Sequence, residues 1–345
     1  MKKRIIISLA GIFFFTVLFI FTDEFASGVI TGLSNCTGAV IPSLFPFMIA
    51  ASLTGSGDIP ERIKKVLNPI TKFFFNLPSD CFFAVIIGQL GGYLAGAKSA
   101  QTLYKAGRLT ESQSKNLLLF SINAGLGFTV NAVGSVMLRS RESGRILFVS
   151  LVVSSLILGF IVRRLPCPES NMNSAKRIDT PISELIVNSV TSAAESTLYA
   201  CGFVTVFSGI CAVTNSLIYN ETAKTLISCL LEVTNGCFVA SEKVSLPIIA
   251  AICAFGGICV HLQIFSVAKD IKINIPVFYG FRIMHTALAY AVCKIILYFF
   301  PIEQSVFLSL TPNSAVWSYS APASLSLLFL SALLILDLDN REKIW

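Results

Sequence analysis

Long apolar runs are the feature of this sequence that most restricts its fold. A run of roughly 17–25 apolar residues is long enough to cross the ~30 Å hydrocarbon core of a bilayer. Charged residues make up only 13% of the 345 residues, about half of the share in a soluble domain. The sequence therefore predicts an all-α, polytopic helical membrane protein. The predicted spans are residues 5–21, 38–55, 81–97, 117–138, 146–162, 198–218, 246–268, 277–300 and 321–336.

The net charge of +7 lies mainly in the loops between these spans. No long basic stripe interleaved with aromatic residues is present outside them, so the charge does not indicate nucleic-acid binding. Between Arg62 and Arg145 there are eleven Lys or Arg residues, whereas the corresponding loops of the second half hold four. If basic loops stay in the cytoplasm, the two halves face opposite ways, as in inverted repeats. The alternative is that the bias means little in such short loops.

The chain divides into five parts. Residues 1–22 have a basic flank and an apolar run without a small-residue cleavage site, which predicts an uncleaved transmembrane anchor. Residues 28–165 form a first membrane repeat, 166–181 a polar linker and 182–300 a second repeat. Residues 301–345 hold a C-terminal transmembrane helix and a tail.

Two Gly-Gly pairs lie in similar apolar contexts, GGYLAGAK from Gly91 and GGICVHLQ from Gly256. Small residues four apart, from Ala84 to Ala100, would give a straight helix a face for close helix packing. Alternatively the chain breaks at the Gly-Gly pairs and forms re-entrant hairpins whose backbone lines a cavity. Both interpretations remain open from the sequence. The glycines expected to be structural are Gly88, Gly91, Gly92, Gly96, Gly125, Gly236, Gly256 and Gly257.

Polar residues at membrane depth are costly and are therefore candidates for a site. Asn123 is suited to bind a polar solute, or to hydrogen-bond a neighbouring helix. Glu232 is either a solvated loop carboxylate or the acid of a half-helix end that binds a cation or polar solute. Lys98 either reaches the headgroups or meets an anionic substrate. The residues expected to bind substrate are Gln89, Tyr93, Lys98, Asn123, Glu232, Asn235 and Gln263.

Other kinds of site are poorly supported. The ten cysteines contain no C-x-x-C pair and are expected to be packing residues. His261 and His285 lack an acidic residue at metal spacing, so no metal site is expected. No catalytic or nucleotide-binding motif is present, and we expect neither an enzyme nor a cofactor. Arg282 is expected to anchor its span at the membrane interface.

Several of these segments together resemble the sporulation integral membrane protein YlbJ group, whose chains carry two nucleoside-recognition (Gate) repeats. The segments are IPSLFPF (41–47), GGYLAGAK (91–98), SINAGLGF (121–128), LLEVTNG (230–236) and FGGICVHLQ (255–263). The resemblance implies a protein of a bacterial cytoplasmic membrane, in the forespore or mother cell, that is needed for spore cortex formation. It also implies distant kinship to the gating units of nucleoside and ferrous-iron transporters. The group's prolines are replaced here by Leu94 and Leu126, so a backbone break near Tyr93 must depend on the glycines.

These observations leave two functions open. The first is a transporter or pore for a small polar solute or ion, with its path between the Gly-Gly segments. The second is a scaffold in the lipid bilayer that holds spore-envelope proteins or further copies of itself, with the polar residues joining helices. No nucleic-acid partner is expected.

Overall fold

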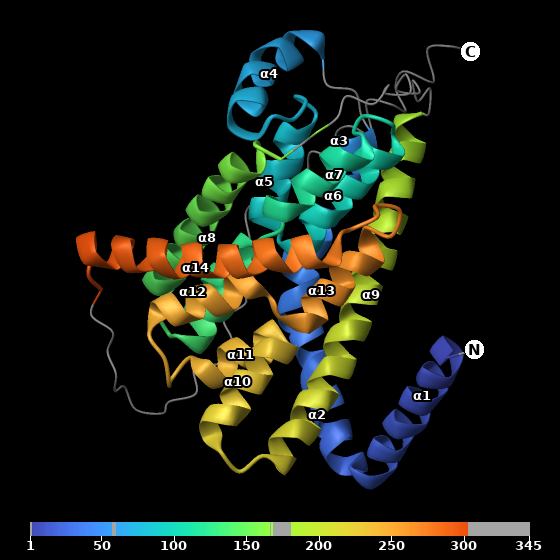
Figure 1. Cartoon of the computed structure of the whole chain (residues 1–345), viewed down its shortest axis with the longest axis vertical. Coiled ribbons are helices and arrows are strands. Elements are labelled where there is room, and N and C mark those ends of the chain that lie inside the picture. Colours follow the sequence, from blue (N-terminus) through green and yellow to red (C-terminus); the bar gives the residue numbers. More distant parts are fainter. Residues whose placement is uncertain (1, 57–59, 166, 168–180, 303–345) are drawn as a thin grey trace.

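The computed structural model describes residues 2–56, 60–165, 167 and 181–302. Every regular element in this part of the chain is a helix (Figure 1). These described residues contain five helices long and apolar enough to cross a membrane: Thr22–Gly55, Arg141–Val162, Ile182–Leu217, Leu246–Val267 and Ile275–Phe299. The predicted all-α polytopic membrane fold is confirmed.

Runs of short helices separate the long ones. Those of the first half are α1 (Lys2–Ile20), α2 (Thr22–Asn35), η1 (Cys36–Val40), α3 (Ile41–Ser56), α4 (Glu61–Phe75), α5 (Cys81–Gly91), α6 (Tyr93–Lys105), α7 (Glu111–Phe120), η2 (Gly127–Met137) and α8 (Arg141–Val162). Those of the second half are α9 (Ile182–Leu217), α10 (Glu221–Leu231), α11 (Val233–Ala240), α12 (Leu246–Phe255), α13 (Gly257–Val267) and α14 (Ile275–Phe299). The labels η1 and η2 mark π-helical turns.

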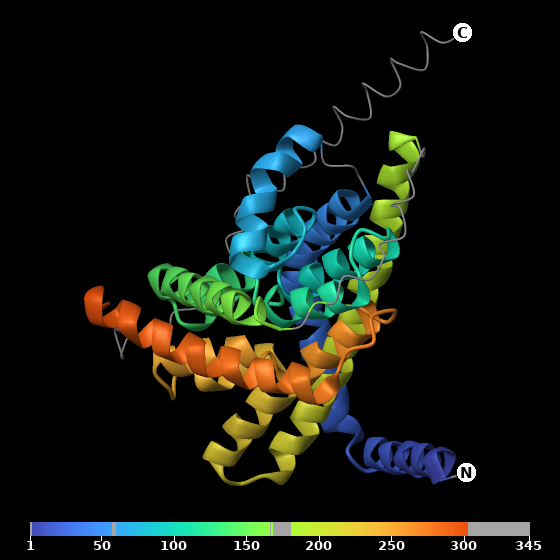
Figure 2. The same ribbon diagram turned by 45° about the horizontal axis from the view of Figure 1, so that its top comes forward.

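Two long helices form the spine of the molecule. The segments α2, η1 and α3 follow one another without a break, and they lie beside the 36-residue helix α9 (Figure 1). At 1.5 Å per residue α9 is about 54 Å long, well beyond the ~30 Å bilayer core. Small residues allow the close contact, because a Cβ added at Gly28 would lie 2.7 Å from the Cα of Gly209. The N-terminal helix α1 projects away from this spine (Figures 1 and 2).

The helices follow the same order twice. Each half has a long helix, a hairpin of two short helices, an extended broken helix and a final long helix. The matching pieces are α5–α6 with α10–α11, α7–η2 with α12–α13, and α8 with α14, while α4 has no counterpart. The contacts between the halves obey the same correspondence. Helix α6 packs on α13, and its counterpart α11 packs on η2, which is the counterpart of α13. The matching helices α8 and α14 pack on each other. The opposite orientation of the halves in a membrane stays a prediction.

The two Gly-Gly pairs do not occupy matching places in this order. The break at Gly91–Gly92 corresponds to the break at Glu232, whereas Gly256–Gly257 corresponds to the unwound residues 121–126. Each Gly-Gly pair interrupts a helix, but in a different piece of its half.

The predicted spans 81–97 and 117–138 are broken helices rather than single ones. The chain turns at Gly92, with φ +102° and ψ −178°, and at Gly256, with φ +87°. The straight-helix interpretation is therefore wrong, since the chain is broken at both Gly-Gly pairs. The break at Gly92 forms the α5–α6 hairpin, whereas α12 and α13 form a broken helix, and a re-entrant position in the membrane stays a prediction. The predicted span 321–336, the tail and most of the linker 166–181 lie outside the described residues.

Candidate functional site

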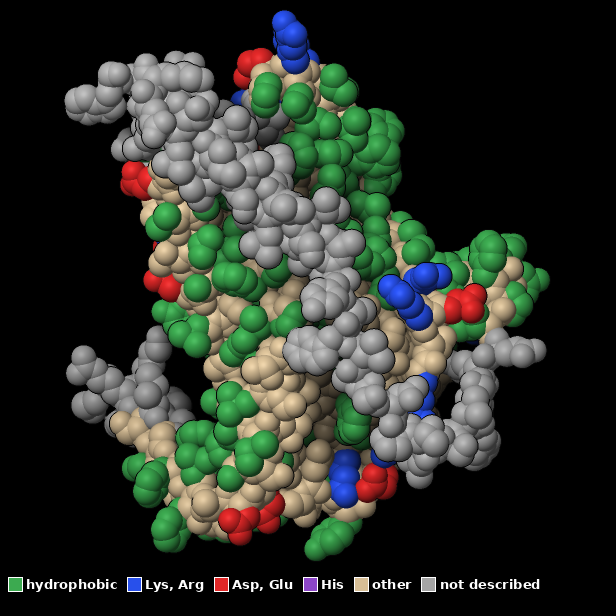
Figure 3. Space-filling view, turned by 180° about the vertical axis from the view of Figure 1, so that it is seen from behind, with side chains coloured by type: hydrophobic (Ala, Val, Ile, Leu, Met, Phe, Trp, Pro, Cys, Tyr) green, Lys and Arg blue, Asp and Glu red, His purple; other side chains and the backbone are tan. Residues whose placement is uncertain are grey.

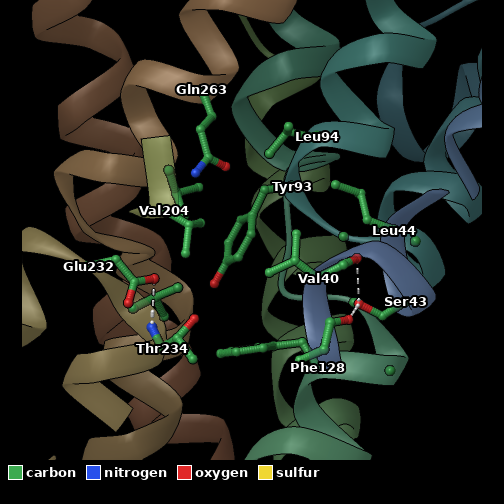
Figure 4. A pocket seen from close by; sticks show the side chains of 17 residues that line it. Val40, Ser43, Leu44, Tyr93, Leu94, Phe128, Val204, Glu232, Thr234 and Gln263 are labelled. Atoms are coloured by element: carbon green, nitrogen blue, oxygen red, sulfur yellow. Dashed lines mark hydrogen bonds between the residues drawn. The ribbon is translucent and has the colours of Figure 1, made fainter. Parts of the chain in front are cut away.

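The helix breaks of both halves meet at one cavity of about 80 Å³. Its walls come from the end of α5 and the start of α6, from the unwound segment before η2, from the break before α11, and from α13, with α9 and the η1–α3 turn closing the sides. The lining residues are Ala39, Val40, Ser43, Leu44, Gly91, Gly92, Tyr93, Leu94, Gly125, Gly127, Phe128, Val204, Glu232, Val233, Thr234, Val260 and Gln263 (Figure 4). Three predicted site residues, Tyr93, Glu232 and Gln263, are among them.

Glu232 places a buried carboxylate on the cavity wall. Its backbone is extended, with φ −146° and ψ 124°, which ends α10 and makes Glu232 the N-cap of α11. One carboxylate oxygen accepts from the Thr234 N–H at 2.9 Å and the other from the Asn235 N–H at 2.8 Å. The side chain is 1% exposed and has no Lys, Arg or His partner within the described part of the chain. Backbone N–H groups and the dipole of α11 stabilise this acid.

Gln263 supplies the second polar group. Its Nε2 donates to the Cys259 Sγ at 3.2 Å and weakly to the Ala200 carbonyl at 3.5 Å. Its carbonyl oxygen accepts no hydrogen bond from any described residue, although the side chain is only 4% exposed. An acceptor on the cavity wall without a protein donor is suited to a bound solute or water.

Tyr93 lies in the middle of the cavity, between Glu232 and Gln263 on one side and Val40 on the other (Figure 4). Its hydroxyl donates to the Cys253 carbonyl, near the end of α12. The break after α12 leaves its last carbonyls without helical partners. Tyr93 of the first half therefore holds a broken helix of the second half.

Arg282 makes the reverse connection. It lies in α14, is 1% exposed, and donates from its two terminal nitrogens to the carbonyls of Leu119 and Ile122, each at 2.8 Å. These carbonyls end α7, where the chain unwinds. The predicted interfacial anchor is therefore wrong. The only sequence signal for the true role was a lone cation inside an apolar helix.

Gln89 and Asn123 lie outside the cavity and bind each other. The Asn123 Nδ2 donates to the Gln89 Oε1 at 2.8 Å, and the Gln89 Nε2 donates to the Ser155 hydroxyl at 2.7 Å. Asn123 also accepts from the Ala124 N–H at 2.9 Å. The contacts among Gln89, Asn123 and Ser155 thus join α5, the segment after α7, and α8.

Lys98 and Asn235 also lie outside the cavity lining, and both contact α9. The Lys98 ammonium donates to the hydroxyls of Ser192 and Ser196, and the Asn235 Nδ2 donates to the Ser208 hydroxyl at 3.0 Å. The four residues outside the cavity were predicted to bind substrate, and the structure places their side chains in helix contacts.

The predicted structural glycines lie at close contacts. Gly88 and Gly96 face each other across the α5–α6 hairpin, each with a hypothetical Cβ 3.2 Å from the other's Cα. Gly91 packs on Phe47, and Gly125 packs on the backbone of Gly91 and Gly92. In the second half, Gly236 packs on Cys229, and both Gly256 and Gly257 have positive φ angles.

The histidines and cysteines belong to packing in the described structure. His261 bonds the Phe255 carbonyl at 2.8 Å and has the Phe278 and Tyr279 rings against it. No group of three His, Cys, Asp or Glu residues suited to a metal is found among the described residues. The ten cysteines are all unpaired.

The arrangement of spans, broken helices and a central cavity can be compared with known proteins. The chain is similar to the sporulation integral membrane protein YlbJ of Bacillus subtilis. The two are 24% identical over 297 residues, which covers 74% of this chain and 73% of the relative. This distant similarity supports the family resemblance seen in the sequence, while the Gate character of the repeats stays a prediction. No protein-family model and no solved structure matches the chain.

Proposed function

We propose that this integral membrane protein is a transporter or pore for a small polar solute or ion. The observation that carries the proposal is the cavity at the meeting point of the helix breaks, with the buried Glu232 carboxylate and the unpaired Gln263 carbonyl on its wall. Irregular backbone at membrane depth is tolerated where it lines a cavity. Broken helices with ionisable residues near the midplane are typical of substrate sites in transporters.

The size of the cavity favours a small solute. Pockets for drug-sized ligands have volumes of roughly 300–1,000 Å³, whereas a cavity for one water needs a volume of about 10–15 Å³. A volume of about 80 Å³ therefore suits an ion with some of its waters, or a solute of a few heavy atoms. Two oxygen acceptors on the wall favour a cation or a hydrogen-bond donor.

The proposed setting is the bacterial cytoplasmic membrane, in the forespore or mother cell during sporulation. The printed name of the Bacillus subtilis relative supports sporulation. A part in spore cortex formation follows only from the family resemblance.

A scaffold without transport is the second candidate. It is favoured by the use of Gln89 and Asn123 in joining helices. In that case the cavity is a packing defect, and the spore-envelope proteins or further copies of the chain are the partners.

Flux through liposomes tests the proposal. The full chain is reconstituted, and entry of glycerol, urea, mannitol and Rb⁺ is compared with entry into empty liposomes. We expect at least one small probe to enter faster, and Glu232→Gln to slow that entry about tenfold or more, because it removes a charge-assisted interaction. Mannitol serves as the larger probe.

Glu221→Gln is the matched control. Glu221 is an exposed acid that pairs with Lys224 and Lys243, each at 2.9 Å, far from the cavity lining. Its replacement should leave the flux unchanged. Flux equal to that of empty liposomes for all four probes, or equal loss in both variants, would overturn the proposal.

A further inference from the structure

A second, wholly apolar hollow lies on the outside of the first half. It has a volume of about 540 Å³ and is walled by α4, α5 and α8. The walls include Ile70 and Phe74 of α4, Phe82 and Ile86 of α5, and Val153 and Phe160 of α8. Figure 3 shows hydrophobic side chains gathered along this side of the molecule, below the end that carries α4. We call this hollow the α4–α8 groove.

The groove has the length of a lipid chain in one leaflet. Its α8 wall runs from Val153 to Ile161, which is about 12 Å at 1.5 Å per residue. Half of a ~30 Å hydrocarbon core is about 15 Å. Because α8 is a candidate membrane span that ends at Val162, the groove runs inward from the end of that span.

Basic residues gather where the groove meets the end of α8. The Arg163 guanidinium lies 4.8 Å from the centre of the Phe160 ring and 5.4 Å from that of Phe73, so the aromatic residues of α8 and α4 hold it at this end. Arg164 follows it directly and is exposed.

Arg163 and Arg164 have no carboxylate partner among the described residues. The acid at the start of α5, Asp80, is already paired with Arg108 at 3.5 Å. An apolar groove that ends at unpaired cations at the edge of a membrane span is complementary to an anionic lipid in both charge and shape. A neutral lipid that only solvates the protein would pack in the groove but would not pair with the cations.

We propose that the α4–α8 groove binds an anionic phospholipid. One acyl chain lies along α8, and the phosphate lies against Arg163 and Arg164. This site is separate from the cavity that contains Glu232, and it does not depend on whether the protein transports a solute.

Native mass spectrometry of the full chain in detergent tests the site. Phosphatidylglycerol and phosphatidylcholine with identical acyl chains are titrated separately, so that the headgroup is the sole difference. We expect wild type to retain phosphatidylglycerol in preference. The double variant Arg163→Gln/Arg164→Gln should lose up to about 25-fold of that affinity, since each basic residue near an anionic surface contributes about fivefold.

Two further variants separate the headgroup site from general charge and from folding. Arg62→Gln/Lys65→Gln removes the same charge from the exposed start of α4 and should change nothing. Ile157→Trp fills the groove and should weaken retention of both lipids. Equal retention of the two lipids by wild type, or equal losses in the two double variants, would overturn the proposal. Elution of every variant at the wild-type volume in size-exclusion chromatography checks the fold.

Discussion

Replacing Gly92 by alanine tests the turn that closes the α5–α6 hairpin. With φ +102° and ψ −178°, Gly92 occupies a backbone region that is essentially restricted to glycine. Space is not the obstacle, because an added Cβ would lie 3.4 Å from the Gly125 nitrogen, an ordinary contact. The cost comes from the backbone torsion angles, which alanine adopts here only with strain. We expect Gly92→Ala to lower the free energy of unfolding by about 1–3 kcal/mol.

A straight helix would give the opposite sign. Glycine in a helix interior is less stable than alanine by roughly 0.5–1 kcal/mol, so Gly92→Ala would then stabilise the protein. Gly280→Ala is the matched control, since Gly280 lies within α14 and an added Cβ meets nothing within 4 Å. Unfolding is measured by titrating sodium dodecyl sulfate into mixed micelles and following helicity by circular dichroism. A Gly92→Ala protein at least as stable as the Gly280→Ala protein would refute the reasoning.

Three other perturbations address the polar contacts. Asn123→Ala leaves the Gln89 carbonyl oxygen buried without its donor and should lower the unfolding free energy by about 1–3 kcal/mol in the same titration; an unchanged value would contradict the packing role. Arg282→Met removes both donors from the end of α7, so hydrogen exchange over residues 119–126 should speed up, whereas exchange at unchanged rates would show that the arginine holds nothing there. The pKa of Asp270 lies below its usual value because it accepts from Lys105, with 3.0 Å between the charged atoms. Its stabilisation is present above the unfolded pKa near 4 and is lost as the pH falls through the folded pKa, so wild type and Asp270→Asn should differ in unfolding midpoint at pH 7 and converge at low pH.

Much of the fold followed from residue patterns. Run length and low charge predicted a helical membrane protein, and the Gly-Gly pairs predicted interruptions in their helices. A helix end at Glu232 was one of two alternatives open from the sequence, since its signal is a capping acid in an apolar stretch rather than a glycine at the break, and the structure shows that helix end. The sequence predicts one span over residues 117–138, and no local signal marks the unwound segment 121–126 inside it.

The site was only partly predictable because partners decide whether a polar residue is free. Gln89 and Gln263 look alike in the sequence, yet Gln89 meets Asn123 and Ser155 while the carbonyl of Gln263 meets no donor. The sequence predicts Arg282 at the membrane interface, whereas the structure places its guanidinium against the end of α7. The contacts of Gln89 join residues 34 and 66 positions apart and those of Arg282 join residues 160 and 163 apart, beyond the reach of periodicity or spacing.

The crossed bonds of Tyr93 and Arg282 make the two halves mutually dependent. Each half carries a side chain that bonds to the end of a helix in the other half. Severed halves would each expose an unfinished helix end, and a rearrangement begun in one half reaches the other through a bond to its backbone. The two halves are thus linked by hydrogen bonds that run in both directions.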